Sequence, residues 1–133
     1  MSRKTVREHV YKLIFEYLFS GTPNPRTYAV FSASDGEQDN AEYMQTVYYG
    51  VIEKYDELKS IIIKHAEGFS YDRIFKPDLA ALLLSIYEMK YMPDIPNAVS
   101  INEAVELVKT YSTDKSHVFV NGVLASVNKE LSH

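Results

Sequence analysis

Residues 116–127 read SHVFVNGVLASV, and this stretch decides the fold class because it matches two different structures. Its Asn121-Gly122 pair lies between two apolar triplets, which is the strongest short-range signal of a β-hairpin. The apolar residues also follow the spacing i, i+3, i+4, i+7 and i+11 of one helical face: Val120, Val123, Leu124, Val127 and Leu131. A lone hairpin is marginally stable, and we find no other strand-like run for it to join. The pattern therefore predicts a helix over 114–131.

A glycine in the interior of that helix destabilises it by about 1 kcal/mol relative to alanine. The usual compensation is the close approach of another helix. We therefore expect Gly122 to pack against a neighbouring helix. Asn121 lies off the apolar stripe and can face solvent, a backbone group or a ligand.

Apolar periodicity, caps and glycine or proline stops predict helices in the rest of the chain as well. In the first half of the chain we expect a helix capped by Ser2 and ended by Gly21, one from about Pro25 to Ser32, and one carrying Met44 to Ile52. In the second half we expect one capped by Asp56 and stopped by Gly68, and one that begins at Pro77. A capping box at Ser100–Glu103 opens a further helix that reaches about Tyr111. Thr113 or Asp114 can cap the last helix. The run LAALLLSIYEM is apolar nearly all round, which predicts a helix buried at the centre of the fold.

The composition is that of an ordinary globular protein, with 46% apolar and 24% charged residues. A length of 133 residues predicts a single domain, residues 1–133. The absence of cysteine excludes disulfides and thiolate metal sites and favours a reducing compartment, the cytoplasm. We recognise no secretory signal and no apolar run long enough to span a bilayer, so a membrane role is not expected.

The sequence offers no recognisable enzyme motif. It lacks a glycine-rich phosphate loop, H-E-x-x-H and G-x-S-x-G. Its four histidines share no metal-ligand spacing, and His65 lies on an apolar helical face where a packed side chain is expected. We therefore expect no catalytic activity, no metal and no cofactor.

Charge is unevenly distributed, although the net value is only −4. Arg3, Lys4 and Arg7 make the start of the chain basic, whereas residues 35–57 are mostly acidic. Such a basic helix start can bind phosphates through Coulomb attraction and counterion release. The alternative is a solvated helix start, and on these residues alone the alternative is favoured, although positive charge opposes the helix dipole there, which mildly suggests a use.

A second candidate site is the start of the last helix. Free amides at a helix start, together with Lys115 and Ser116, can hold a phosphate. Phe119 offers a face on which an unpaired base can stack, and Asn121 can contact a base edge. The alternative places Phe119 in the core and Lys115 in solvent, and on these residues alone the alternative is favoured.

Three segments resemble the NusB family of bacterial transcription antitermination factors. SINEAVELVKTYSTDKSHVFVNGVL is similar to the family's C-terminal signature, with its I-N-E-A-x-E-L-x-K helix, D-K-S turn and F-V-N-G-V-L helix. KTVREHVYKLIF resembles the opening helix, and DRIFKPDLAALLLSIYEMKYMPDIPNAV resembles the central helix with its Y-E-M end. The resemblance covers nearly the whole chain and is weakest between residues 20 and 45.

The resemblance implies an all-α fold of about seven helices in two packed bundles around the apolar central helix. It implies binding of the single-stranded boxA element of leader and ribosomal RNA as a heterodimer with NusE, a small-subunit ribosomal protein. The complex would join other Nus factors on RNA polymerase and promote transcription of ribosomal RNA operons.

Matched motif by motif, the resemblance assigns two groups of site residues. The RNA-binding residues would be Arg3, Lys4, Arg7, Lys115, Ser116, Phe119 and Asn121. Acidic Asp78 and Glu88 on the central helix would bind the partner, since a basic ribosomal protein suits acidic residues.

Two other readings stay open. The chain can be a protein-only interaction module that holds a ribosomal protein or forms a homodimer, because its basic start is thinner than in many family members. This domain type also occurs fused to RNA methyltransferases, but here methyl transfer would need a separate protein.

Overall fold

The computed structural model describes residues 2–35 and 38–131, and the regular elements in these ranges are all helices. In chain order they are α1 (Arg3–Ser20), α2 (Pro25–Asp35), α3 (Gln38–Glu53), α4 (Tyr55–His65), the short 3-10 helix η1 (Tyr71–Arg73), α5 (Lys76–Tyr91), α6 (Asn97–Tyr111) and α7 (Ser116–Leu131). The all-helical fold class is confirmed. The Asn121-Gly122 pair lies inside α7, so the hairpin signal is false.

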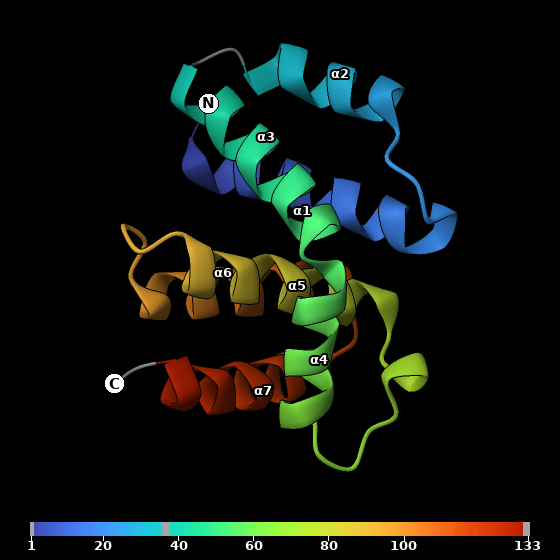
Figure 1. The fold of residues 1–133 in the computed structure, drawn as a ribbon, viewed down its shortest axis with the longest axis vertical. Coiled ribbons are helices and arrows are strands. Elements are labelled where there is room, and N and C mark those ends of the chain that lie inside the picture. Colours follow the sequence, from blue (N-terminus) through green and yellow to red (C-terminus); the bar gives the residue numbers. More distant parts are fainter. Residues whose placement is uncertain (1, 36–37, 132–133) are drawn as a thin grey trace.

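The helices form two groups that share α5. Figure 1 shows α1, α2 and α3 together in the upper half, and α5, α6 and α7 together in the lower half, with α4 beside them. Helix α5 contacts α1 and α3 from the first group and α4, α6 and α7 from the second. The central position predicted for this helix is therefore confirmed.

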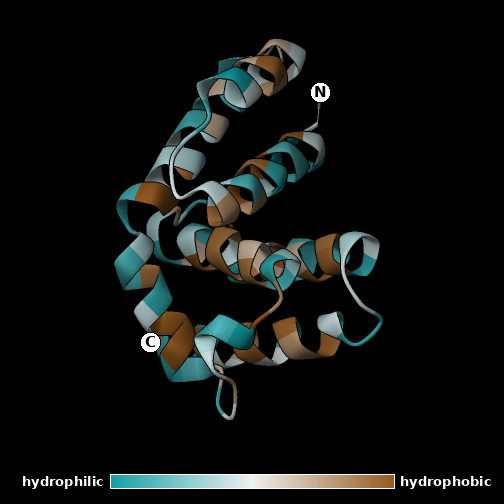
Figure 2. Cartoon of the chain, turned by 90° about the vertical axis from the view of Figure 1, so that its right-hand side faces the viewer, coloured by the Kyte–Doolittle hydropathy of each residue, from teal (hydrophilic) through white to brown (hydrophobic). Residues whose placement is uncertain are grey.

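Burial of α5 explains why its sequence is apolar nearly all round. Every residue from Asp78 to Met89 is buried, and Leu82 and Leu83 are completely inaccessible to solvent. Burying a leucine side chain stabilises the fold by about 1.5–3 kcal/mol. The other helices are amphipathic, and hydrophobic and hydrophilic segments alternate along their ribbons in Figure 2.

The ends of α1 are formed by the two residues that the sequence indicated. The Ser2 side chain accepts a hydrogen bond from the Thr5 amide at 3.1 Å, which satisfies one free donor of the first turn. Gly21 ends the helix with a left-handed backbone, φ 74°, a conformation that glycine adopts without steric penalty.

The starts of α4 and α6 differ from the predictions. Helix α6 begins at Asn97, so Ser100 lies inside it and is buried, and no capping box forms there. The Ser100 hydroxyl instead donates to Glu88 across the core at 2.7 Å. Asp56 lies in the first turn of α4, and Lys54 occupies the cap position without a side-chain capping bond. Both predictions relied on local sequence, and at Ser100 the contact with Glu88 takes the place of a capping bond.

The expectation that Gly122 packs against another helix is wrong. Gly122 is exposed, and a Cβ atom added there would meet nothing within 4 Å. The close approach occurs at Gly50 on α3, where the Tyr87 ring of α5 occupies the space that a Cβ would need. No helix among the described residues has the length and apolar character needed to cross a membrane.

Candidate nucleic-acid interface

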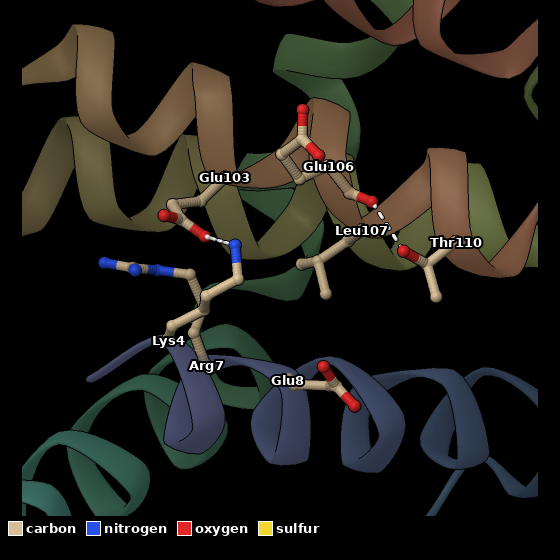
Figure 3. Close-up of a pocket in the computed structure, with 7 residues that line it drawn as sticks. All are labelled: Lys4, Arg7, Glu8, Glu103, Glu106, Leu107 and Thr110. Carbon is tan, nitrogen blue, oxygen red and sulfur yellow. Dashed lines mark hydrogen bonds and ion pairs between the residues drawn. The ribbon is translucent and has the colours of Figure 1, made fainter. Parts of the chain in front are cut away.

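The basic residues at the start of α1 are each engaged by the protein itself. The Arg3 guanidinium lies 4.4 Å from the centre of the Tyr43 ring, a cation–π arrangement, and its buried Nε has no hydrogen-bond partner. Lys4, whose side chain is 66% exposed, pairs with Glu103 of α6 at 3.7 Å. Figure 3 shows this pair across the cleft between α1 and α6. Lys4 therefore presents its charge to solvent, whereas the Arg3 guanidinium lies over the Tyr43 ring.

Arg7 forms a buried ion pair with Glu88 of α5. Its Nε donates to Oε2 of Glu88 at 2.8 Å and its Nη2 to Oε1 at 3.4 Å. The same carboxylate accepts hydrogen bonds from the hydroxyls of Tyr43 and Ser100. Burial opposes the charge of Arg7, but the nearby Tyr43 and Glu88 outweigh this and raise the pKa of Arg7. Burial, followed by the charge of Glu88, raises the pKa of Tyr43 well above its ordinary value.

These contacts bear on two of the predicted roles, which stay predictions. Arg7 is 5% exposed and Glu88 is 0% exposed, so neither side chain reaches the surface. Arg7 cannot bind a phosphate without leaving its carboxylate, and Glu88 cannot offer its charge to a partner protein. Two charges at helical spacings on α1 and α5 look like surface charges in sequence, but here they neutralise each other inside the fold.

Ser116 and Asp78 also lie inside, at the turn between α6 and α7. Ser116 is 2% exposed, and its hydroxyl lies 2.8 Å from the hydroxyls of both Ser112 and Thr113 and accepts from the Thr113 amide at 3.2 Å. Asp78 is 5% exposed and accepts a hydrogen bond from Ser112 at 2.6 Å. Their structural role is to fix this turn on α5. In the chain alone, Ser116 offers no exposed hydroxyl to an RNA and Asp78 no exposed carboxylate to a partner, and both roles stay predictions.

Lys115 and Phe119 border a hollow of about 340 Å³ at the start of α7. The opposite wall comes from the segment between α4 and α5, which contributes Phe69, Arg73 and Phe75. Lys115 and Arg73 are exposed, and Phe69 and Phe75 are 57% and 60% exposed. The hollow therefore combines two cations with several aromatic faces, the chemistry that binds phosphates and unpaired bases.

Phe119 is half-buried rather than part of the core, and Asn121 is exposed. The Phe119 ring contacts the Phe69 ring, with 4.7 Å between ring centres and 58° between ring planes. This pair forms the aromatic ridge, as we call Phe69 and Phe119 below. The alternative that placed Phe119 in the core and Lys115 in solvent holds in part, because Lys115 is exposed and Phe119 packs against the core while remaining half-exposed.

Sequence reasoning missed Phe69 and Arg73. Both lie outside the long helices and show no periodicity that would assign them to a face. A large apolar residue directly after Gly68, in a segment between two helices, was the available signal. Their proximity to α7 depends on the path of residues 66–75, which no local pattern predicts.

The two predicted RNA-binding groups lie apart from each other. Figure 1 shows the start of α1 on the left of the upper half, whereas α7 begins on the right of the lower half. The cleft beside Lys4 is lined by Glu8, Glu103 and Glu106, and these carboxylates would repel a phosphate. The hollow at the start of α7 is lined by a single carboxylate, that of the buried Asp78, and is therefore the more favourable anion site.

A separate aromatic surface lies along the second half of α1. Tyr11, Phe15, Pro77 and Tyr111 line a hollow of about 220 Å³, together with Lys12. Phe15 contacts Phe19, with ring centres 4.9 Å apart, and Phe19 is 64% exposed. An apolar surface of this kind, left uncovered in a single chain, is typical of a protein contact.

The described residues contain no group of three His, Cys, Asp or Glu side chains placed to hold a metal ion. His65 is packed, as expected from its apolar face. Its Nδ1 lies 2.7 Å from the Ser126 hydroxyl and its Nε2 3.0 Å from Glu130.

Comparison with known proteins agrees with this helical arrangement. The model of the NusB family matches residues 4–129. The chain belongs to the NusB family. The transcription antitermination protein NusB of Bacillus pumilus is 40% identical over 131 residues, covering 98% of each chain, and that of Bacillus velezensis is 42% identical over 132 residues with the same coverage.

Solved structures support the family assignment. T. maritima NusB has a TM-score of 0.87 at 28% identity, covering 98% of this chain and 92% of that one. A chain from a crystal structure of antitermination factors NusB and NusE in complex with dsRNA has a TM-score of 0.85 at 25% identity, covering 96% of both chains. The NusB fold thus extends over nearly all of the sequence, including the segment 20–45 where the resemblance was weakest.

Proposed function

We propose that the chain is a non-catalytic transcription antitermination factor that binds boxA RNA together with NusE in the cytoplasm. Relatives of the same length carry this antitermination function in their names. A structural neighbour comes from a complex of NusB, NusE and RNA. Through NusE and RNA the chain would join other Nus factors on RNA polymerase and promote transcription of ribosomal RNA operons.

The observation that carries the proposal is the exposed pairing of cations and aromatic rings at the start of α7. Lys115 and Arg73 would neutralise phosphates, and Phe119 would stack on an unpaired base. Asn121, exposed on the same helix, would contact a base edge. Lys4 and Arg3 would add outlying phosphate contacts, while Arg7 and Ser116 would act only by holding α1 and the α7 turn in place.

NusE would dock on the aromatic surface described above, the hollow beside the second half of α1 that includes Phe15 and Pro77 and is continued by Phe19. Phe75 lies next to Lys76 and Pro77 in sequence and also lines the hollow at α7. The protein and RNA surfaces would therefore adjoin at Phe75. In this arrangement NusE extends the surface available to one RNA strand, and aromatic side chains supply the contact area that protein interfaces favour.

Titration of labelled boxA RNA with the chain alone and with NusE, at several salt concentrations, tests this function. The logarithm of the binding constant should fall linearly with the logarithm of salt concentration, with a slope of about −0.7 for each phosphate neutralised on a single strand. The variant Lys115→Gln with Arg73→Gln should lower both affinity and slope. Lys129→Gln, at the far end of α7, is the matched control and should change neither.

A second function is a protein-only module that binds NusE or a second copy of itself. It is favoured by the engagement of Arg3, Lys4 and Arg7 with Tyr43, Glu103 and Glu88, which leaves the start of α1 with little free charge. Binding of NusE without any RNA binding, to single-stranded or double-stranded boxA, would support this second function and reject the first.

A further inference from the structure

The exposed Gly122 on α7 has no explanation within the chain. It destabilises the helix by about 1 kcal/mol relative to alanine. No packing contact compensates for this, because the space where a Cβ would lie is open. Its backbone is ordinary helix, since the described glycines with positive φ are Gly21 and Gly68. The remaining physical use of a bare backbone is the close approach of a different molecule.

Gly122 lines a second hollow, of about 380 Å³, on the other side of the aromatic ridge. Phe69 and Phe119 border both hollows, so the ridge separates them. Val118, 67% exposed, adds an apolar side chain to the second hollow. A strand that stacks on the ridge would therefore pass directly onto the backbone at Gly122.

The two hollows differ in charge. The first has Lys115 and Arg73 at its border and one buried carboxylate, that of Asp78, whereas the second has Glu67 and His65. His65 lies between Ser126 and Glu130, so its ring is engaged by neighbours. The carboxylate of Glu67 repels phosphate but accepts hydrogen bonds from the exocyclic amines of bases. The second hollow is thus suited to a base and the first to the phosphates that precede or follow it.

We propose that Gly122 is a close-approach residue of the RNA surface, where an unpaired base that has passed the Phe69–Phe119 ridge packs flat against the backbone of α7. This inference rests on the proposed function and adds Phe69, Glu67 and Gly122 to it. Charge complementarity decides the occupant, because the cations of the first hollow hold the phosphates on their side of the ridge and leave the adjoining base to cross it.

The variants Gly122→Ala and Gly122→Leu test the proposal. Because the added Cβ meets open space and alanine favours the helix, Gly122→Ala should raise the melting temperature. Its affinity for single-stranded boxA RNA in the presence of NusE should nevertheless fall, on the order of 10-fold if one stacked base is displaced. Gly122→Leu should lower the affinity further, and affinity for NusE alone should stay unchanged.

The matched control is Ala29→Leu, which adds a side chain at an exposed position of α2, in the upper half of the molecule in Figure 1 and far from α7. It should leave RNA affinity unaltered. Phe69→Ala gives an independent measurement, since it removes half of the ridge and should also weaken RNA binding.

The outcomes separate this inference from the proposed function. If the unaltered chain with NusE fails to bind boxA RNA, the proposed function fails and the inference with it. If the unaltered chain binds and Gly122→Leu binds equally well, only the inference is rejected. Loss of NusE binding, or a change of oligomeric state, in Gly122→Leu would assign the hollow to a protein contact and would likewise overturn it.

Discussion

The Nε atom of Arg7 lies 2.8 Å from Oε2 of Glu88, and the two side chains are 6% and 1% exposed. Tyr43 and Ser100 donate hydrogen bonds to the same carboxylate. Side chains of α1, α3, α5 and α6 therefore meet at Glu88. This network fixes the position of α1 and, with it, the direction in which Lys4 points.

Arg7→Met should strongly destabilise the protein because it leaves the Glu88 carboxylate buried without its counter-charge. Removing one partner of a buried ion pair lowers the free energy of unfolding by about 3–5 kcal/mol. Urea unfolding followed by circular dichroism measures this loss. The double variant Arg7→Met, Glu88→Leu removes both charges and should recover only part of the stability, because the hydroxyls of Tyr43 and Ser100 lose their acceptor. A loss below about 1 kcal/mol in Arg7→Met, the range of an exposed pair, would contradict a buried role for this residue.

Lys4→Gln, unlike Arg7→Met, should leave the stability of the fold nearly unchanged and weaken the salt-dependent binding of RNA. The pair between Lys4 and Glu103 is exposed on the lysine side, and such pairs contribute about 0–1 kcal/mol. The melting temperature should therefore hardly change. If Lys4 neutralises one phosphate of a single strand, the slope of the logarithm of the binding constant against the logarithm of salt concentration should become less steep by about 0.7. An unchanged slope would show that Lys4, and with it the start of α1, does not contact the RNA backbone.

The sequence predicted those features that depend on neighbours along the chain. Apolar spacing identified α7 against the hairpin signal, and Ser2 and Gly21 marked both ends of α1. The buried centre of the fold followed from the uniform apolar character of α5. Each of these signals acts within a few turns of helix, where spacing alone determines which side chains share a face.

Features that depend on contacts between distant residues escaped prediction. Arg7 and Glu88 are 81 positions apart, so nothing local distinguishes this pair from two surface charges. The glycine that packs closely is Gly50 rather than Gly122, because the decisive neighbour, Tyr87, lies on another helix. At the candidate site, Lys115, Phe119 and Asn121 were found from local pattern, whereas Phe69 and Arg73 required the fold to bring the α4–α5 segment against α7.

The two glycines should respond to alanine with opposite signs. In Gly50→Ala the new methyl would overlap the Tyr87 ring, and such overpacking costs about 1–3 kcal/mol, which exceeds the gain in helix propensity. We expect a net loss of about 1 kcal/mol, compared with a gain of similar size for Gly122→Ala. Thermal unfolding of both variants measures the contrast. Equal shifts in the same direction would mean that Tyr87 moves aside freely.

Glu57 should make stability depend on pH in the acid range. Its carboxylate on α4 accepts hydrogen bonds from Lys90 and Tyr91 at the end of α5, and these lower the pKa of Glu57 below its ordinary 4.5. A carboxyl group whose pKa is lower in the folded than in the unfolded protein binds protons preferentially when unfolded. Its contribution to stability is therefore complete above pH 4.5 and is lost as pH falls through the folded-state pKa.

Glu57→Gln should accordingly be less stable than the unaltered chain near neutral pH, and this difference should shrink as the pH falls below 4.5. Urea unfolding of both proteins across that range gives the two curves. Asp94→Asn, an exposed acid in the loop after α5, is the control, and its difference from the unaltered chain should stay small throughout. A Glu57→Gln difference that remains constant down to about pH 2 would show that the contacts of Glu57 act through packing rather than through its charge.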